Sequence, residues 1–223
     1  RVQSLGLASA QGTARGLSAP TASAMVAGAE DYDKARRLAG DFRDLFQWRV
    51  PAEIVNGIAA RDFRVQTIDA AVGDLNLDFY QVGIQRFPQG WDADRLLQYF
   101  IRNINEFLDT DNTEFIPYDS SDAGRLASPD PRGTVFKLDI IGPDNAAVVI
   151  SDKQPQFYAV STINTPWSGD HPVSGHRQFG YFVVDGRTTF YTRGADRATL
   201  AFPGTEGMIY SGGERLWRSF QAK

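Results

Sequence analysis

The residues best suited to chemistry lie in one short segment, from Asp170 to Arg177. It contains both histidines of the chain, with Ser174 between them. Histidine titrates near neutral pH and can act as a general base, and a neighbouring serine or carboxylate can complete a nucleophilic site. The segment therefore supplies our candidate catalytic residues His171, His176 and Asp170.

The surroundings of these residues do not match a known catalytic or metal-binding motif. A nucleophilic serine on a strand-to-helix turn sits in a Gly-x-Ser-x-Gly frame, whereas Ser174-Gly175 leads into a strand. The chain has no cysteine, and its histidines lack the spacing of a zinc or iron site. The acidic run beginning at Asp109 has Glu114 where an EF-hand loop needs glycine. We expect no metal and no cofactor.

A second set of candidates follows from strand pairing around the Asp185-Gly186 turn. A two-residue turn pairs Arg193 with Gln178, which brings Arg193 and Arg197 close to the strand that begins at the second histidine. Two arginines there could hold a carboxylate or a phosphate, or they could form a salt-bridge cluster with Asp196. The candidate ligand-binding residues are Trp167, His176, Arg193 and Arg197. Trp167 would form a hydrophobic lip.

Composition excludes several classes of partner. The net charge is -4, so we expect no attraction to nucleic acid or to an anionic membrane. Arginine far outnumbers lysine, which we interpret as genomic base composition of a bacterial type. No apolar run approaches the roughly 18 residues of a membrane-spanning helix, which predicts a soluble chain. The sequence begins at Arg1, as expected of a processed or excised chain, and this permits secretion.

Helical patterns dominate residues 1–60, which we expect to form an N-terminal extension and helical region packed on the body. Ala8 to Gly28 has the composition of a linker. Asp31 or Asp33 can cap a helix that continues to Phe46, and Pro51 suits the first turn of a shorter one. The shorter helix carries three apolar residues on one side, which are Ile54, Val55 and Ile58.

Residues 61–223 are predicted to form an α+β domain. A strand over Leu77–Phe87 precedes a helix that Asp92 caps and that keeps its apolar period to Leu108. Asp109–Gly133 has the composition of turns. The remaining segments are strands over Val135–Ile141, Ala146–Ile150, Phe157–Ile163, Phe179–Val184 and Arg187–Arg193, and a short terminal helix containing Trp217.

This order predicts a curved antiparallel sheet of about five to seven strands packed on a long helix and a C-terminal helix. From about Leu77 onward the order of elements is similar in outline to the helix-grip (START-like) folds. That resemblance implies a hydrophobic ligand held between sheet and helix. The terminal hairpin agrees with this expectation. Its aromatic residues lie on both faces, so both faces must be covered by other parts of the protein or by a ligand.

Three functions remain open at this stage. The first is a non-enzymatic binding domain for an apolar or amphipathic ligand or for a protein partner. The second is a hydrolase or secreted effector with His171 or His176 as general base, which requires Asp170 or Asp196 within hydrogen-bond reach of an imidazole. The third is an assembly module whose N-terminal segment, Ala8 to Gly28, docks onto another subunit.

Overall fold

The computed structural model describes residues 12–13, 42–72, 74–111, 113–140, 145–200 and 206–222. Its α-helices are α2 (Phe42–Phe46), α3 (Ala52–Ala59), α4 (Ala93–Arg102), α5 (Ser120–Ala127) and α6 (Glu206–Ala222), and its 3-10 helices are η2 (Ile68–Ala70) and η3 (Ile104–Phe107). Its strands are β1 (Gly12–Thr13), β2 (Arg64–Val65), β3 (Asn76–Ile84), β4 (Thr113–Pro117), β5 (Val135–Ile140), β6 (Ala146–Gln154), β7 (Phe157–Asn164), β8 (Val173–Val184) and β9 (Arg187–Ala198).

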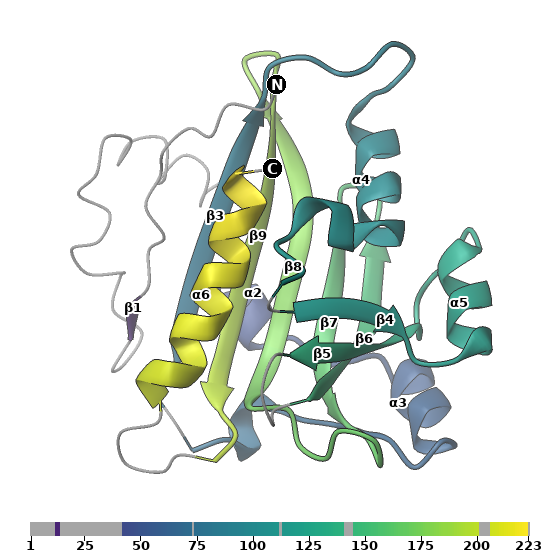
Figure 1. Cartoon of the computed structure of the whole chain (residues 1–223), viewed down its shortest axis with the longest axis vertical. Helices are drawn as coiled ribbons and strands as arrows, with labels where there is room; N and C mark the ends of the chain where they lie inside the picture. The colour runs from purple at the N-terminus through teal and green to yellow at the C-terminus, as the bar shows by residue number, and fades with distance from the viewer. Residues whose placement is uncertain are drawn as a thin grey trace.

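The strands form one antiparallel sheet in the order β1-β3-β9-β8-β7-β6-β5-β4, and β2 pairs with β7. Because β1 and β2 have two residues each, seven strands carry the sheet, which curls into a half-barrel (Figure 1). The first long strand, β3, pairs with the last, β9. This pairing brings Asn76 beside Asp196, which lies 120 residues further along the chain.

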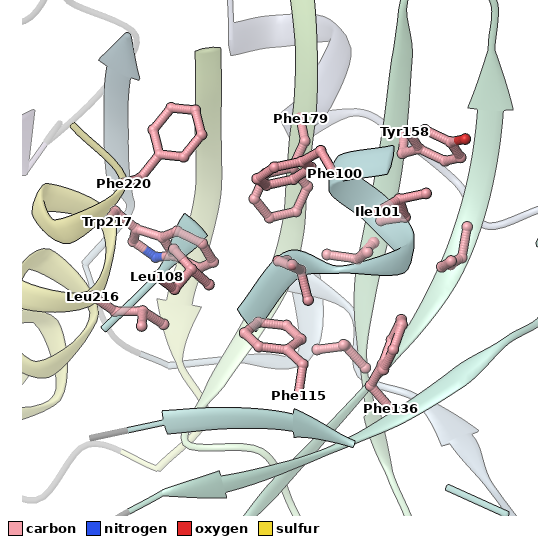
Figure 2. Close-up of a cluster of buried hydrophobic side chains, with 14 of the residues drawn as sticks. Phe100, Ile101, Leu108, Phe115, Phe136, Tyr158, Phe179, Leu216, Trp217 and Phe220 are labelled. Atoms are coloured by element: carbon pink, nitrogen blue, oxygen red, sulfur yellow. The ribbon is translucent and has the colours of Figure 1, made fainter. Parts of the chain in front are cut away.

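Two helices cover the concave face of the sheet (Figure 1). Phe100 on α4 and Trp217 on α6 each place their rings 5.4 Å from that of Phe179 on β8. Figure 2 shows these rings among the buried apolar side chains that join both helices to the strands. The predicted arrangement, a curved antiparallel sheet packed on a long helix and a C-terminal helix, is therefore confirmed.

The convex face is covered by the elements that precede β3. Ile54 and Ile58 of α3 pack on buried aliphatic residues of β5, β6 and β7, and Leu45 of α2 packs near Ala195 of β9. Val55 was predicted to share the buried side of α3, but it is 37% exposed. Most of the helix predicted from Asp31 or Asp33 to Phe46, and most of the segment Ala8 to Gly28, lies outside the described residues. The division at residue 60 stays a prediction.

The predicted turn and register of the terminal hairpin are confirmed. Asp185 and Gly186 have φ values of 51° and 73°, the positive values that a tight two-residue turn needs. Gln178 pairs with Arg193, as expected. Both strands are longer than predicted, because polar residues and glycines interrupt the apolar alternation before Phe179 on β8 and after residue 193 on β9.

The polar stretch Asp109–Gly133, predicted to form only turns, contains β4 and α5. The side chain of Asn105 holds β4 in place, because it donates to the carbonyl of Phe115 and accepts from its N–H, both at 2.9 Å. Asp119 caps α5 by accepting from two backbone N–H groups. α4 begins at its predicted cap, Asp92, but it ends at Arg102 and not at Leu108.

Candidate functional site

A cavity of about 520 Å³ lies between the concave face of the sheet and α6. Its apolar wall comes from aromatic and aliphatic side chains of β4 to β8 and of α6, namely Phe115, Leu138, Ile140, Val148, Val160, Phe179, Leu216 and Trp217. The more exposed lining residues belong to the segment that enters β8 and to α6. They are His171, Pro172, Val173, Gly213, Glu214 and Arg215.

The floor of the cavity is polar where β3, β9 and β8 run side by side. Strand register aligns Asn76, Asp196 and Gly175 in one row across these strands. The next row aligns Asp78, Gly194 and Arg177. Because side chains alternate between the two faces of a strand, both rows point to the same face as the buried aromatic core.

Glycine in each row leaves space for its charged neighbours. A Cβ at Gly194 would lie 2.4 Å from Nη2 of Arg177, and a Cβ at Gly175 would lie 2.6 Å from Cβ of Asp196. A side chain at either position would therefore collide with the groups that make the floor polar. The conformation of these two glycines is ordinary, so close approach and not backbone freedom accounts for them.

Arg177 is bonded on several sides. Its Nη2 donates to Oδ2 of Asp78 at 2.5 Å, its Nη1 donates to Oγ1 of Thr192 at 3.1 Å, and its Cζ lies 4.2 Å from the ring centroid of Trp217. The side chains of Arg177 and Asp78 are 10% and 5% exposed. Such a desolvated ion pair is strong only while its remaining acceptors are also satisfied.

The second carboxylate of the floor, Asp196, is also buried. Its Oδ1 accepts from Nδ2 of Asn76 at 3.3 Å. Burial first, and the nearby carboxylate of Asp78 second, raise the pKa of Asp196 to about 7, although Arg177 and Asn76 act to lower it. Asp196 therefore exchanges its proton in the neutral range where an ordinary aspartate is fully ionised.

His176 borders the cavity, but its side chain alternates with that of Arg177 along β8 and so points to the opposite face. Ser151 Oγ donates to the carbonyl of Ala159, and Ser161 Oγ donates to Ser151 Oγ at 2.8 Å. Since both hydroxyl protons are used, Nδ1 of His176 carries the proton that bonds it to Ser161 Oγ at 2.8 Å. Burial lowers the pKa of His176 to about 4, so the ring is neutral. In this arrangement the imidazole cannot remove the proton of Ser161.

His171 lines the cavity, but its neighbours hold it as part of a loop. Its Nδ1 accepts from the N–H of Val173 at 3.1 Å, and its backbone N–H and carbonyl both bond to the side chain of Gln66. Burial lowers the pKa of His171 to about 4. Asp170 bonds instead to Asn164 at 2.7 Å. Neither Asp170 nor Asp196 forms a hydrogen bond with an imidazole.

The other candidate ligand-binding residues lie away from this cavity. Arg193, 2% exposed, points to the convex face and bonds to Asp44 and Gln178. Arg197 alternates with it onto the same face. Trp167 is 37% exposed in the loop after β7, with Nζ of Lys137 5.2 Å from its ring centroid. The role of these residues in ligand binding stays a prediction.

Sequence reasoning missed Asn76 and Asp78 as site residues. The signal was present for Asp78, which alternates with Leu77 in the predicted strand Leu77–Phe87 and shares a face with Tyr80 and Val82. Asn76 lies one residue before that predicted strand. An aspartate on the buried face of a strand implies a buried partner. The partner, Arg177, could not be identified, because it depends on the pairing of β3 with β9.

Among the described residues, no group of three or more His, Asp or Glu side chains is placed to bind a metal ion. None of the described helices is long and apolar enough to cross a membrane.

No protein-family model and no curated protein matches the chain. Solved structures that match include Ara h 8.0201, 8% identical with a TM-score of 0.41, over 66% of this chain and 96% of that chain. A Bacillus thuringiensis protein is 12% identical with a TM-score of 0.38, over 66% and 96%. The human StarD13 lipid transfer and protein localization domain is 8% identical with a TM-score of 0.36, over 78% and 100%. At these values the likenesses carry no argument about function.

Proposed function

We propose that this domain binds an apolar or amphipathic small molecule between the curved sheet and α6. The observation that carries the proposal is the cavity of about 520 Å³, whose wall is mostly aromatic and aliphatic. Small-molecule sites are typically concave, mostly apolar and about 300–1,000 Å³ in volume, with a few polar groups that orient the ligand. The cavity of this domain has each of these properties.

The packing around the cavity supports the same proposal. Protein interiors are close-packed, and an apolar void forgoes the dispersion contacts that would stabilise its lining. Here the ring of Trp217 packs on those of Phe115 and Phe179 (Figure 2). These three side chains line the cavity and leave its space open. A bound apolar molecule would restore those contacts.

The hydrolase alternative lacks the contact it requires, because neither Asp170 nor Asp196 bonds to an imidazole. The assembly alternative depends on the segment Ala8 to Gly28, most of which lies outside the described residues. No contact among the described residues favours either alternative. Binding of a small molecule is therefore the function that we put forward.

The test is binding of Nile red, an uncharged apolar dye, to the full chain and to a cavity-filling variant. Val160 lines the cavity, and Val160→Phe adds a ring within it. We expect one dye per chain in the native protein and at least tenfold weaker binding in the variant.

The matched control is Val183→Phe, the same change at a position on β8 that is 52% exposed and outside the cavity. It should leave dye affinity unchanged. If the native protein does not bind the dye, or if both variants bind it as well as the native protein does, the proposed function is wrong.

A further inference from the structure

The charges on the floor of the cavity do not balance. Two carboxylates, Asp78 and Asp196, face one guanidinium, that of Arg177. Arg177 is already engaged by Asp78, by Thr192 and by the ring of Trp217. With both carboxylates ionised, the floor would carry one uncompensated negative charge.

One acceptor on this floor also has no partner. The side chain of Asp78 is 5% exposed, its Oδ2 accepts from Arg177, and its Oδ1 accepts no hydrogen bond from any described residue. A buried acceptor without a partner is destabilising, and more so when it is charged. Asp78 and Asp196 both line the cavity, so a ligand there can supply the missing donor.

Among the described residues, the other groups that line the cavity do not supply this charge. His171, at the entrance to β8, is neutral because burial lowers its pKa to about 4. On α6, Glu214 is paired with Arg218 at 2.6 Å, and Arg215 is an exposed residue at the rim. Thr113 and Thr162, from β4 and β7, complete the polar lining and are uncharged.

We infer that the floor formed by Asn76, Asp78, Arg177 and Asp196 binds the protonated amine of an amphipathic ligand, whose apolar part occupies the rest of the cavity. The inference rests on the proposed function and names the chemical class of ligand. An ammonium group brings one positive charge and up to three donors, which match one excess carboxylate and one unpartnered acceptor. A carboxylate ligand would meet two carboxylates at the same place.

Binding of an amine is coupled to the proton of Asp196. At pH values below about 7 the free protein holds that proton, because burial and Asp78 raise the pKa of Asp196 to about 7. An ammonium beside the carboxylate favours the ionised form, so binding releases one proton to the solvent. The affinity for an amine should therefore fall about tenfold for each pH unit below 7 and be constant above it.

The experiment displaces Nile red from the full chain with three ligands that share one alkyl chain: decylamine, decanol and decanoate. At pH 8 we expect decylamine to bind at least tenfold more tightly than decanol, and decanoate to bind most weakly. At pH 5.5 the preference for the amine should largely disappear, whereas decanol should bind equally at both pH values.

Asp196→Asn provides the test of the residue. The substitution removes the excess charge and leaves the Arg177–Asp78 pair intact, so we expect the preference for amine and its pH dependence to be lost while decanol still binds. The control, Asp139→Asn, neutralises an exposed aspartate of β5 and should keep both the preference for the amine and its pH dependence. Equal displacement by all three ligands, or a pH-independent preference, would overturn the inference even where the dye binds. Absence of dye binding would instead refute the proposed function.

Discussion

Arg177 and Arg193 are buried on adjacent strands of one hairpin but on opposite faces of the sheet. Arg193 bonds to both oxygens of Asp44, at 3.1 and 2.7 Å, and to Oε1 of Gln178 at 2.8 Å. Asp44 itself is 58% exposed, so water solvates the rest of its carboxylate. Arg177 instead pairs with a carboxylate that is only 5% exposed and has a second carboxylate beside it.

The two clusters show that burial of charge by itself does not mark a site. On the convex face, α2 contributes Asp44, whose half-exposed carboxylate pairs with the guanidinium of Arg193. On the concave face, the same kind of residue borders a cavity, one acceptor lacks a partner, and the charges do not balance. The difference between these faces identifies where a ligand is expected.

The largest effect on the free energy of unfolding is expected from Gly175→Ala, which disrupts the polar floor on the concave face. The new Cβ would lie 2.2 Å from the carbonyl oxygen of Ala195 and 2.6 Å from Cα of Asp196, and backbone cannot yield there without separating β8 from β9. We expect a loss of about 5 kcal/mol in the free energy of unfolding. Gly57→Ala on α3 is the control, because nothing lies within 4 Å of its Cβ, and it should stabilise by about 0.5–1 kcal/mol. Urea unfolding followed by circular dichroism measures both.

The next prediction concerns the pH dependence of stability. The pKa of Asp196 is raised in the folded protein to about 7, from an unfolded value of 3.8, so the folded state binds this proton more tightly. Its stabilising contribution is complete below about pH 4 and is lost as pH rises through 7, up to about 4 kcal/mol. Asp196→Asn removes this contribution from the pH profile.

The measurement is the difference in unfolding free energy between Asp196→Asn and the native protein, from pH 4 to pH 8. Relative to the native protein, the variant should become steadily more stable up to about pH 7 and then level off. The difference isolates Asp196, because the two histidines, whose pKa values are lowered to about 4, contribute equally to both proteins. A flat difference would mean that Asp196 is ionised throughout this pH range. A second positive charge would then have to compensate the carboxylates of Asp78 and Asp196.

More of the fold than of the site could be predicted from the sequence. Local signals sufficed for the Asp185-Gly186 turn, the cap at Asp92 and the apolar faces of the strands, because each depends on neighbouring residues. β4 and α5 were missed because Asn105 and Asp119 hold them through side-chain hydrogen bonds and not through apolar periodicity. These polar contacts were indistinguishable from turn chemistry in the sequence.

The site was harder to predict because its rows join three strands. Arg177 and Asp196 belong to one hairpin, so their proximity could be derived from a two-residue turn. Asp78 joins them only because β3 pairs with β9, a contact between the two ends of the sheet-forming segment. The first hypothesis rested on His171 and His176 because of their residue type. Burial lowers the pKa of both imidazoles and makes them neutral. Strand alternation places the side chain of His176 on the convex face, where it bonds to Ser161.

A smaller loss of stability is expected when the contacts of Arg193 with Asp44 and Gln178 on the convex face are removed. Arg193→Met removes the guanidinium and leaves Gln178 without one donor, so we expect about 3 kcal/mol lower stability. Nile red affinity should stay unchanged, since Arg193 does not line the cavity. The control is Arg187→Met, at an exposed position of the same strand, with a change within about 0.5 kcal/mol. Weaker dye binding in Arg193→Met alone would show that the two faces are coupled.

The smallest effect is expected from replacing both histidines, His171→Gln and His176→Gln, in one protein. Glutamine can still donate to Ser161 at position 176, and the imidazole at 171 is neutral, so no charge is lost from the cavity at pH 8. We expect Nile red and decylamine affinities to change less than about threefold, which is about 0.6 kcal/mol. Competition titrations on the folded variant measure both. Loss of dye binding in a folded variant would make the histidines ligand contacts and would place the polar part of the site at the rim instead of at Asp78 and Asp196.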